Sequence, residues 1–132
     1  MLRYLILILI IPAVLIRVQA QSDTLRFEQP GEGGDPVEYE LIVLDPGYES
    51  FLATQPGLHY HSQSYYENWN QRYVIEWNIR HMQPQQYGDL CEVYIDYRPE
   101  INYGLELNYR LFYYFKFFEK ENGVKLLPGK GR

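Results

Sequence analysis

The chain has 132 residues, of which 46% are hydrophobic and 17% aromatic, and its formal net charge is −5. This length allows one domain, and the single cysteine excludes a disulfide framework and a cysteine-based zinc site. The negative charge argues against nucleic acid as a partner, because nucleic-acid binders need a basic face that replaces counterions.

The first 20 residues have the pattern of a secretory signal peptide. Arg3 provides the positive start, residues 4–16 form an apolar run, and Val18 and Ala20 frame a small-x-small cleavage site. The run would span about 20 Å as a helix, against about 30 Å for a hydrocarbon core, so a stable membrane span is disfavoured. We therefore expect an exported protein, with an uncleaved anchor as the alternative.

The remaining chain divides into three parts by composition. Residues 21–36 are rich in glycine and proline, which predicts a flexible leader. Residues 37–122 hold most of the apolar side chains and are expected to fold as one domain, and residues 123–132 are expected to form a basic flexible tail.

The first elements of the domain are a strand and two helices. Residues 38–45 are a short apolar run that ends at a Pro-Gly turn, which predicts a buried strand, and residues 48–54 predict a short helix. Ser64 and Glu67 have the spacing of a capping box, so a helix is expected over 65–82.

This helix has two apolar faces. One is aromatic and the other aliphatic, so we expect the second half of the helix to be covered on both sides. The aromatic face contains Tyr66, Trp69, Tyr73 and Trp77, and the aliphatic face contains Ile75, Ile79 and Met82.

The last two elements complete the predicted fold. Residues 91–97 alternate in polarity, which predicts a strand with one solvated face, and a right-handed crossover would allow it to lie parallel to the first strand. Residues 103–121 are interpreted as a helix, although residues 103–111 also fit a strand. The expected class is α+β: a small single domain in β-α-β-α order, with a two-stranded sheet and two long aromatic-rich helices.

Several short motifs together resemble a known family. They are Asp45-Pro46-Gly47-Tyr48, Phe51-Leu52, the run from Ser62 to Asn68, Glu76-Trp77-Asn78, Gln83-Pro84, Ile101-Asn102-Tyr103-Gly104 and Asn108-Tyr109. In these motifs the chain resembles a family of small exported proteins of Bacteroidetes-type bacteria that is known only as a domain of unknown function. The resemblance implies the periplasm or cell envelope of a Gram-negative bacterium and brings no catalytic or binding residues.

The strongest candidate for a functional surface is aromatic. Tyr109, Tyr113 and Phe117 recur every four residues on the charged side of the last helix. Exposed rings of this kind indicate a surface for an unknown envelope protein or for self-association, and the alternative is a helix enclosed in its own core. If the rings form a surface, replacing Tyr113 and Phe117 by serine should abolish association and leave the domain folded.

Two enzymatic patterns are weaker. His59 and His61 would share one face of an extended segment, as two imidazole ligands of a transition metal do, but no dense set of further ligands accompanies them. Asp45 and Glu49 follow a predicted buried strand and could act in acid–base hydrolysis, although an aspartate before Pro-Gly is ordinary turn chemistry.

The sequence therefore favours a non-enzymatic binding module with an aromatic surface and no cofactor. The alternatives are a small metal-dependent or carboxylate-based hydrolase, and a carbohydrate-binding module that uses Trp69 or Trp77.

Overall fold

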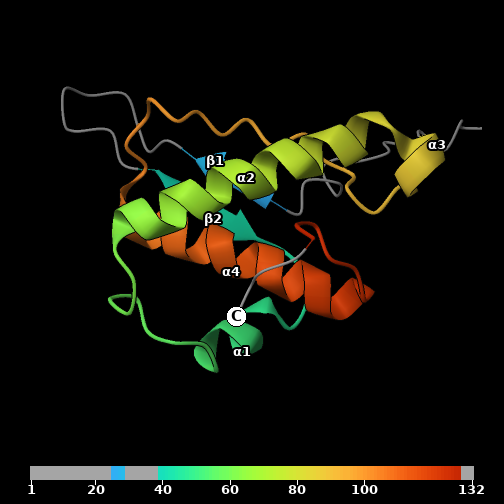
Figure 1. Ribbon diagram of the computed structural model, residues 1–132. Coiled ribbons are helices and arrows are strands. Elements are labelled where there is room, and N and C mark those ends of the chain that lie inside the picture. The colour runs from blue at the N-terminus through green and yellow to red at the C-terminus, as the bar shows by residue number, and fades with distance from the viewer. Residues whose placement is uncertain (1–24, 29–38, 129–132) are drawn as a thin grey trace, which may run out of the picture.

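The computed structural model describes residues 25–28 and 39–128. The predicted signal peptide, most of the predicted leader and the last four residues of the predicted tail lie outside these ranges. In chain order the elements are β1 (Leu25–Glu28), β2 (Glu40–Val43), α1 (Tyr48–Ala53), α2 (Gln63–Met82), α3 (Pro84–Tyr87) and α4 (Gly104–Asn122). The described region is mostly helical (Figure 1).

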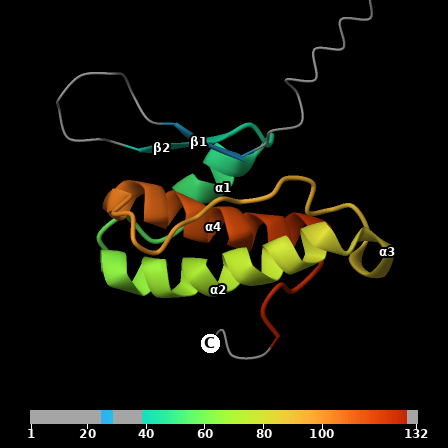
Figure 2. The ribbon, with the colours of Figure 1, turned by 90° about the horizontal axis from the view of Figure 1, so that it is seen from above.

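The two long helices, α2 and α4, lie side by side and run in the same direction (Figures 1 and 2). Their ring contacts advance together along both helices. Tyr66 meets Tyr109 near the start of the pair, with 5.7 Å between ring centroids, and Trp77 meets Phe118 near its end, at 4.7 Å. Because the helices are parallel, the chain between them must return along the length of α2, which is about 30 Å for a helix of this size.

This return segment, residues 88–103, contains the stretch predicted to be a strand. The expected alternation is present, since Cys91 and Ile95 are buried. The prediction of a strand at 91–97 is nevertheless wrong, because side chains of α2 occupy the positions of a neighbouring strand. The Trp77 indole donates to the Val93 carbonyl (2.7 Å), and the Asn78 amide exchanges two hydrogen bonds of 2.9 Å with the Ile95 backbone.

The small sheet differs from the predicted one. β2 lies within the strand predicted at 38–45, but it pairs antiparallel with β1, with Leu25 opposite Val43. The β-α-β-α arrangement is therefore not found. β1 falls in the predicted leader. Its four residues stand among charged and glycine-rich neighbours, and so short a segment did not indicate a strand.

The helices agree better with the sequence, apart from their ends and their cover. α1 and α2 are found where they were expected, but α2 begins at Gln63 and is capped by Ser62, whose side chain accepts from the Tyr65 amide (3.2 Å), rather than by Ser64. The expectation that α2 is covered on both sides is wrong, since Ile75 and Met82 are each more than 60% exposed.

α4 confirms the helical interpretation of residues 103–121 and excludes the strand alternative. It packs against α2, α1 and β2, which makes it the central helix of the fold. A buried polar contact fixes its position along α2. The Asn70 amide donates to the Asn108 carbonyl (2.9 Å), and the Tyr97 hydroxyl donates to the Asn108 side-chain oxygen (2.7 Å).

The expected aromatic surface is not exposed. Tyr109, Tyr113 and Phe117 are only 8%, 5% and 6% exposed. The Tyr109 hydroxyl donates to the carbonyl of Pro56 (2.8 Å), and Phe117 packs edge-on against Tyr48 of α1, with centroids 5.8 Å apart. The side of α4 that the sequence assigned to a partner is thus covered by α1 and the loop that follows it.

The folded part extends beyond residue 122. Leu126 is fully buried, and its amide donates to the Glu119 carboxylate (2.9 Å). Within the described residues, the start of the predicted tail is therefore packed against α4.

Burial of the Tyr113 and Phe117 rings reverses the expected result of removing them. We predict that Tyr113→Ser with Phe117→Ser unfolds the domain, because removing a buried aromatic side chain costs about 3–5 kcal/mol against a typical total stability of about 5–15 kcal/mol. Urea unfolding followed by circular dichroism measures the loss. Tyr60→Ser is the control, since Tyr60 is 68% exposed and should change stability little. A folded double variant would contradict the packing.

Burial also changes the acidity of the core tyrosines. It raises the pKa of Tyr48, Tyr73, Tyr97 and Tyr113 well above the ordinary value of 10.0. The Glu119 carboxylate raises the pKa of Tyr73 further, whereas the Arg110 guanidinium partly offsets the effect of burial at Tyr48.

These shifts predict alkaline unfolding. The unfolded chain releases its phenolic protons near pH 10 while the folded chain retains them, so this contribution to stability is complete below that pH and is lost as the pH rises above it. Tyrosinate absorbance and circular dichroism, recorded together across the titration, should change in one transition for the buried rings. Ordinary ionisation of all 14 tyrosines in an intact fold would contradict the prediction.

Candidate binding pocket

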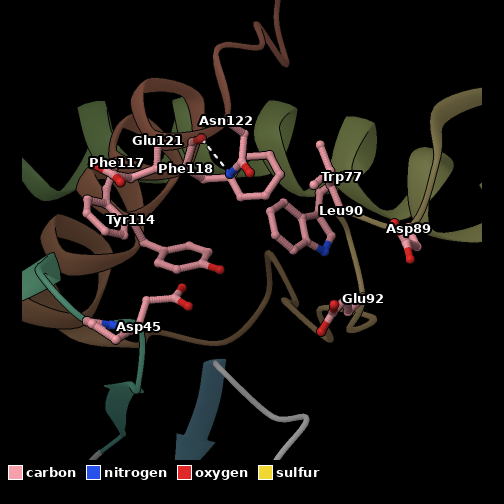
Figure 3. Close-up of a pocket in the computed structure, with 11 residues that line it drawn as sticks. Asp45, Trp77, Asp89, Leu90, Glu92, Tyr114, Phe117, Phe118, Glu121 and Asn122 are labelled. Atoms are coloured by element: carbon pink, nitrogen blue, oxygen red, sulfur yellow. Dashed lines mark hydrogen bonds between the residues drawn. The ribbon is translucent and has the colours of Figure 1, made fainter.

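A pocket of about 320 Å³ lies where four separate parts of the chain meet (Figure 3). They are the turn after β2, the C-terminal half of α2, the start of the return segment and the C-terminal half of α4. We call it the acidic pocket. Its lining consists of Asp45, Pro46, Trp77, Asp89, Leu90, Glu92, Tyr114, Phe117, Phe118, Glu121 and Asn122.

The turn after β2 brings Asp45 to the acidic pocket. The Asp45 carbonyl accepts from the Tyr48 amide (3.3 Å), and Gly47 has a φ of 86°, a backbone conformation that glycine adopts without strain. This turn leads directly into α1, which packs on α4. The Asp45 carboxylate consequently lies next to the Tyr114 ring (Figure 3).

The inner wall of the acidic pocket is aromatic. Trp77 is 2% exposed and Phe118 is 7% exposed, and their rings meet edge to face. The Trp77 indole N–H donates to the Val93 carbonyl, and its ring packs against Phe118. A single orientation makes both contacts, which fixes the indole. The wall is therefore rigid, and each ring presents only a narrow strip to the space.

The rim of the acidic pocket is negatively charged. Four carboxylates line it, from Asp45, Asp89, Glu92 and Glu121, and no lysine, arginine or histidine among residues 39–128 does. None of the four forms an ion pair with a side chain of residues 39–128. They are also not gathered at one point, since the described residues contain no group of three or more His, Cys, Asp or Glu that could hold a metal ion.

The predicted acid–base pair is separated. Asp45 lines the acidic pocket, whereas Glu49 on α1 forms an ion pair with Arg110 of α4 and does not line it. The Arg110 guanidinium also lies over the Tyr48 ring, 5.4 Å from its centroid. Glu49 therefore holds α1 against α4 and is not placed to act together with Asp45.

The two histidines of the predicted metal motif lie away from the acidic pocket. His59 is exposed, and His61 stacks on Tyr65 with 3.7 Å between ring centroids. No third ligand joins them among the described residues. His61 thus contributes to packing at the start of α2.

The remaining candidates are also in structural positions. Trp77 is too buried to offer a face to a sugar, and the ring of half-buried Trp69 lies under the Arg72 guanidinium, 5.2 Å from it. Cys91 is buried, and burial raises the pKa of its thiol to about 11, so it is a poor nucleophile near neutral pH.

Sequence reasoning missed most of the acidic pocket. Asp89 precedes the predicted strand, Glu92 lies on its presumed solvated face, and Glu121 is at the end of a helix. Each is ordinary by itself, and only the return of the chain between two parallel helices brings them together.

Comparison with known proteins gives one match. No curated protein and no solved structure matches the chain. No helix in the part of the chain that the structure describes is long and apolar enough to cross a membrane. The model of a family of unknown function, DUF6146, matches residues 1–129. The expected resemblance to an uncharacterised family is thereby confirmed, and export and a Bacteroidetes-type source remain predictions. The chain belongs to the family of unknown function DUF6146.

Proposed function

We propose that the protein is a non-enzymatic binding protein and that the acidic pocket is its binding site. The observation that carries this proposal is the pocket itself, a space of about 320 Å³ between a rigid aromatic wall and a charged rim. This volume is at the lower end of the range for small-molecule sites, about 300–1,000 Å³. It therefore suits a ligand of few atoms or one side chain of a partner.

The buried aromatic cluster supports this proposal in a different way from the one the sequence indicated. Rings such as Tyr113 act as a scaffold, because they hold the two helices and the return segment in a fixed arrangement. A preformed site loses little free energy to ordering when a ligand binds. The cluster thus contributes to binding through rigidity, without contacting a partner over an open face.

The proposal predicts that a ligand stabilises the fold through this pocket. A panel of cationic, neutral and anionic small molecules, including simple sugars, can be screened by thermal unfolding of the full chain. A ligand at 100 times its Kd adds about 2.7 kcal/mol, which raises the Tm of a domain this small by roughly 10 °C or more.

Two matched variants locate the effect. Leu90→Trp should abolish the shift, because Leu90 lines the acidic pocket and a larger side chain would fill it. Leu44→Trp should preserve the shift, because Leu44 is also an exposed leucine but does not line the pocket. No stabilising compound in the panel, or equal shifts in both variants, would overturn the proposal.

We also propose that the protein acts after export, in a bacterial cell envelope. The signal pattern of residues 1–20 supports this. Expression in a Gram-negative host should yield periplasmic protein that begins at Gln21, as N-terminal sequencing would establish. Ala20→Arg should block cleavage, because the site requires a small residue there. Wild-type protein that retains Met1 and stays in the cytoplasm would contradict export.

A further inference from the structure

Several rings of this protein are in contact with its own cations. Each such contact places a guanidinium or ammonium group 5.1–5.4 Å from a ring centroid. The pairs are Arg72 with Trp69, Arg80 with Tyr87, Arg110 with Tyr48, Lys116 with Tyr73 and Phe112, and Lys120 with Phe51. A cation thus lies beside several rings that are mostly buried or half-buried in the aromatic core.

The acidic pocket departs from this pattern. Among the described residues, no lysine or arginine lies over Trp77 or Phe118, and none lines the space that they face. Carboxylates occupy the rim instead. The site therefore combines an apolar wall with carboxylates that attract positive charge.

We infer that the ligand of the acidic pocket is an organic cation that carries an alkylammonium group. This inference rests on the proposed function and adds the chemical class of the ligand. An ammonium group with its carbon substituents would place apolar surface against Trp77 and Phe118 and its charge among Asp45, Glu92 and the other carboxylates.

The geometry disfavours three other classes of ligand. A metal ion needs several donors at one point, and these carboxylates are not gathered in that way. An anion would meet four carboxylates at the rim and no cation from residues 39–128. A sugar ring stacks on an open aromatic face, and the rings that line the pocket are each less than 10% exposed.

Choline and its neutral isostere, 3,3-dimethylbutan-1-ol, test the inference, because the two have the same shape and differ in charge. Titration of the full chain by isothermal calorimetry should show choline binding, because only choline carries the positive charge that the rim carboxylates attract. The isostere should bind more weakly by roughly tenfold or more, which corresponds to about 1.4 kcal/mol. Asp45→Asn with Glu92→Gln should weaken choline binding by a similar factor.

The control variant removes the same charge elsewhere. Glu40→Gln with Glu100→Gln neutralises two exposed carboxylates outside the acidic pocket, so its affinity for choline should stay close to that of the wild type. Circular dichroism should show that both variants are folded. The changes are isosteric, and none of the four carboxylates forms an ion pair with a side chain of residues 39–128.

The outcomes separate the inference from the proposed function. Choline binding that depends on Asp45 and Glu92 supports both. Equal binding of choline and its isostere, or equal weakening in both double variants, overturns the inference. If choline does not bind but a neutral or anionic compound does, and Leu90→Trp abolishes its binding, the proposed function stands. The inference that the ligand is a cation is then wrong. If no compound of any class binds, both fail.

Discussion

Two parallel helices held together by aromatic rings impose the rest of this architecture. A short turn joins antiparallel helices, whereas parallel helices require a connection that returns over their full length. In this chain the connection is residues 88–103. Its backbone N–H and C=O groups lie against an apolar surface, so they need hydrogen-bond partners. Trp77 and Asn78 provide the hydrogen-bonding groups that a neighbouring strand would otherwise supply. The acidic pocket forms where the start of this segment, the turn after β2 and the C-terminal half of α4 all contribute lining residues.

The long helices were predictable from local patterns, and their environment was not. The spacing of Tyr66, Tyr73 and Trp77 identifies the buried face of α2, and Pro84 marks its end. The opposite face of α2 was expected to be covered because it is apolar, but apolar residues also occur on surfaces. On α4 the rings surround the helix, so periodicity cannot tell a covered side from an open one. α1 decides the matter, through contacts that one sequence does not reveal.

The extended segment is a clearer case of what alternation can establish. Polarity that alternates with a period of two reports which side chains are buried, and Cys91 and Ile95 are buried as expected. It does not report the partner of the backbone, which is why a strand was predicted where α2 side chains bind. The same limit explains the site. Asp45 was identified from its turn, but its neighbours in the acidic pocket, apart from Pro46, come from segments more than 30 residues away along the chain.

Binding is thus assigned to the acidic pocket, a recess in a rigid aromatic scaffold. The two tryptophans of the chain offer the most direct test of this assignment. Their indole N–H groups give two signals in an ¹H–¹⁵N correlation spectrum. The Trp77 signal should be protected from exchange, because its N–H donates to Val93, and it should shift when choline is added, while the distant Trp69 signal stays in place. A shift confined to Trp69, or a Trp77 indole that exchanges freely, would contradict the account.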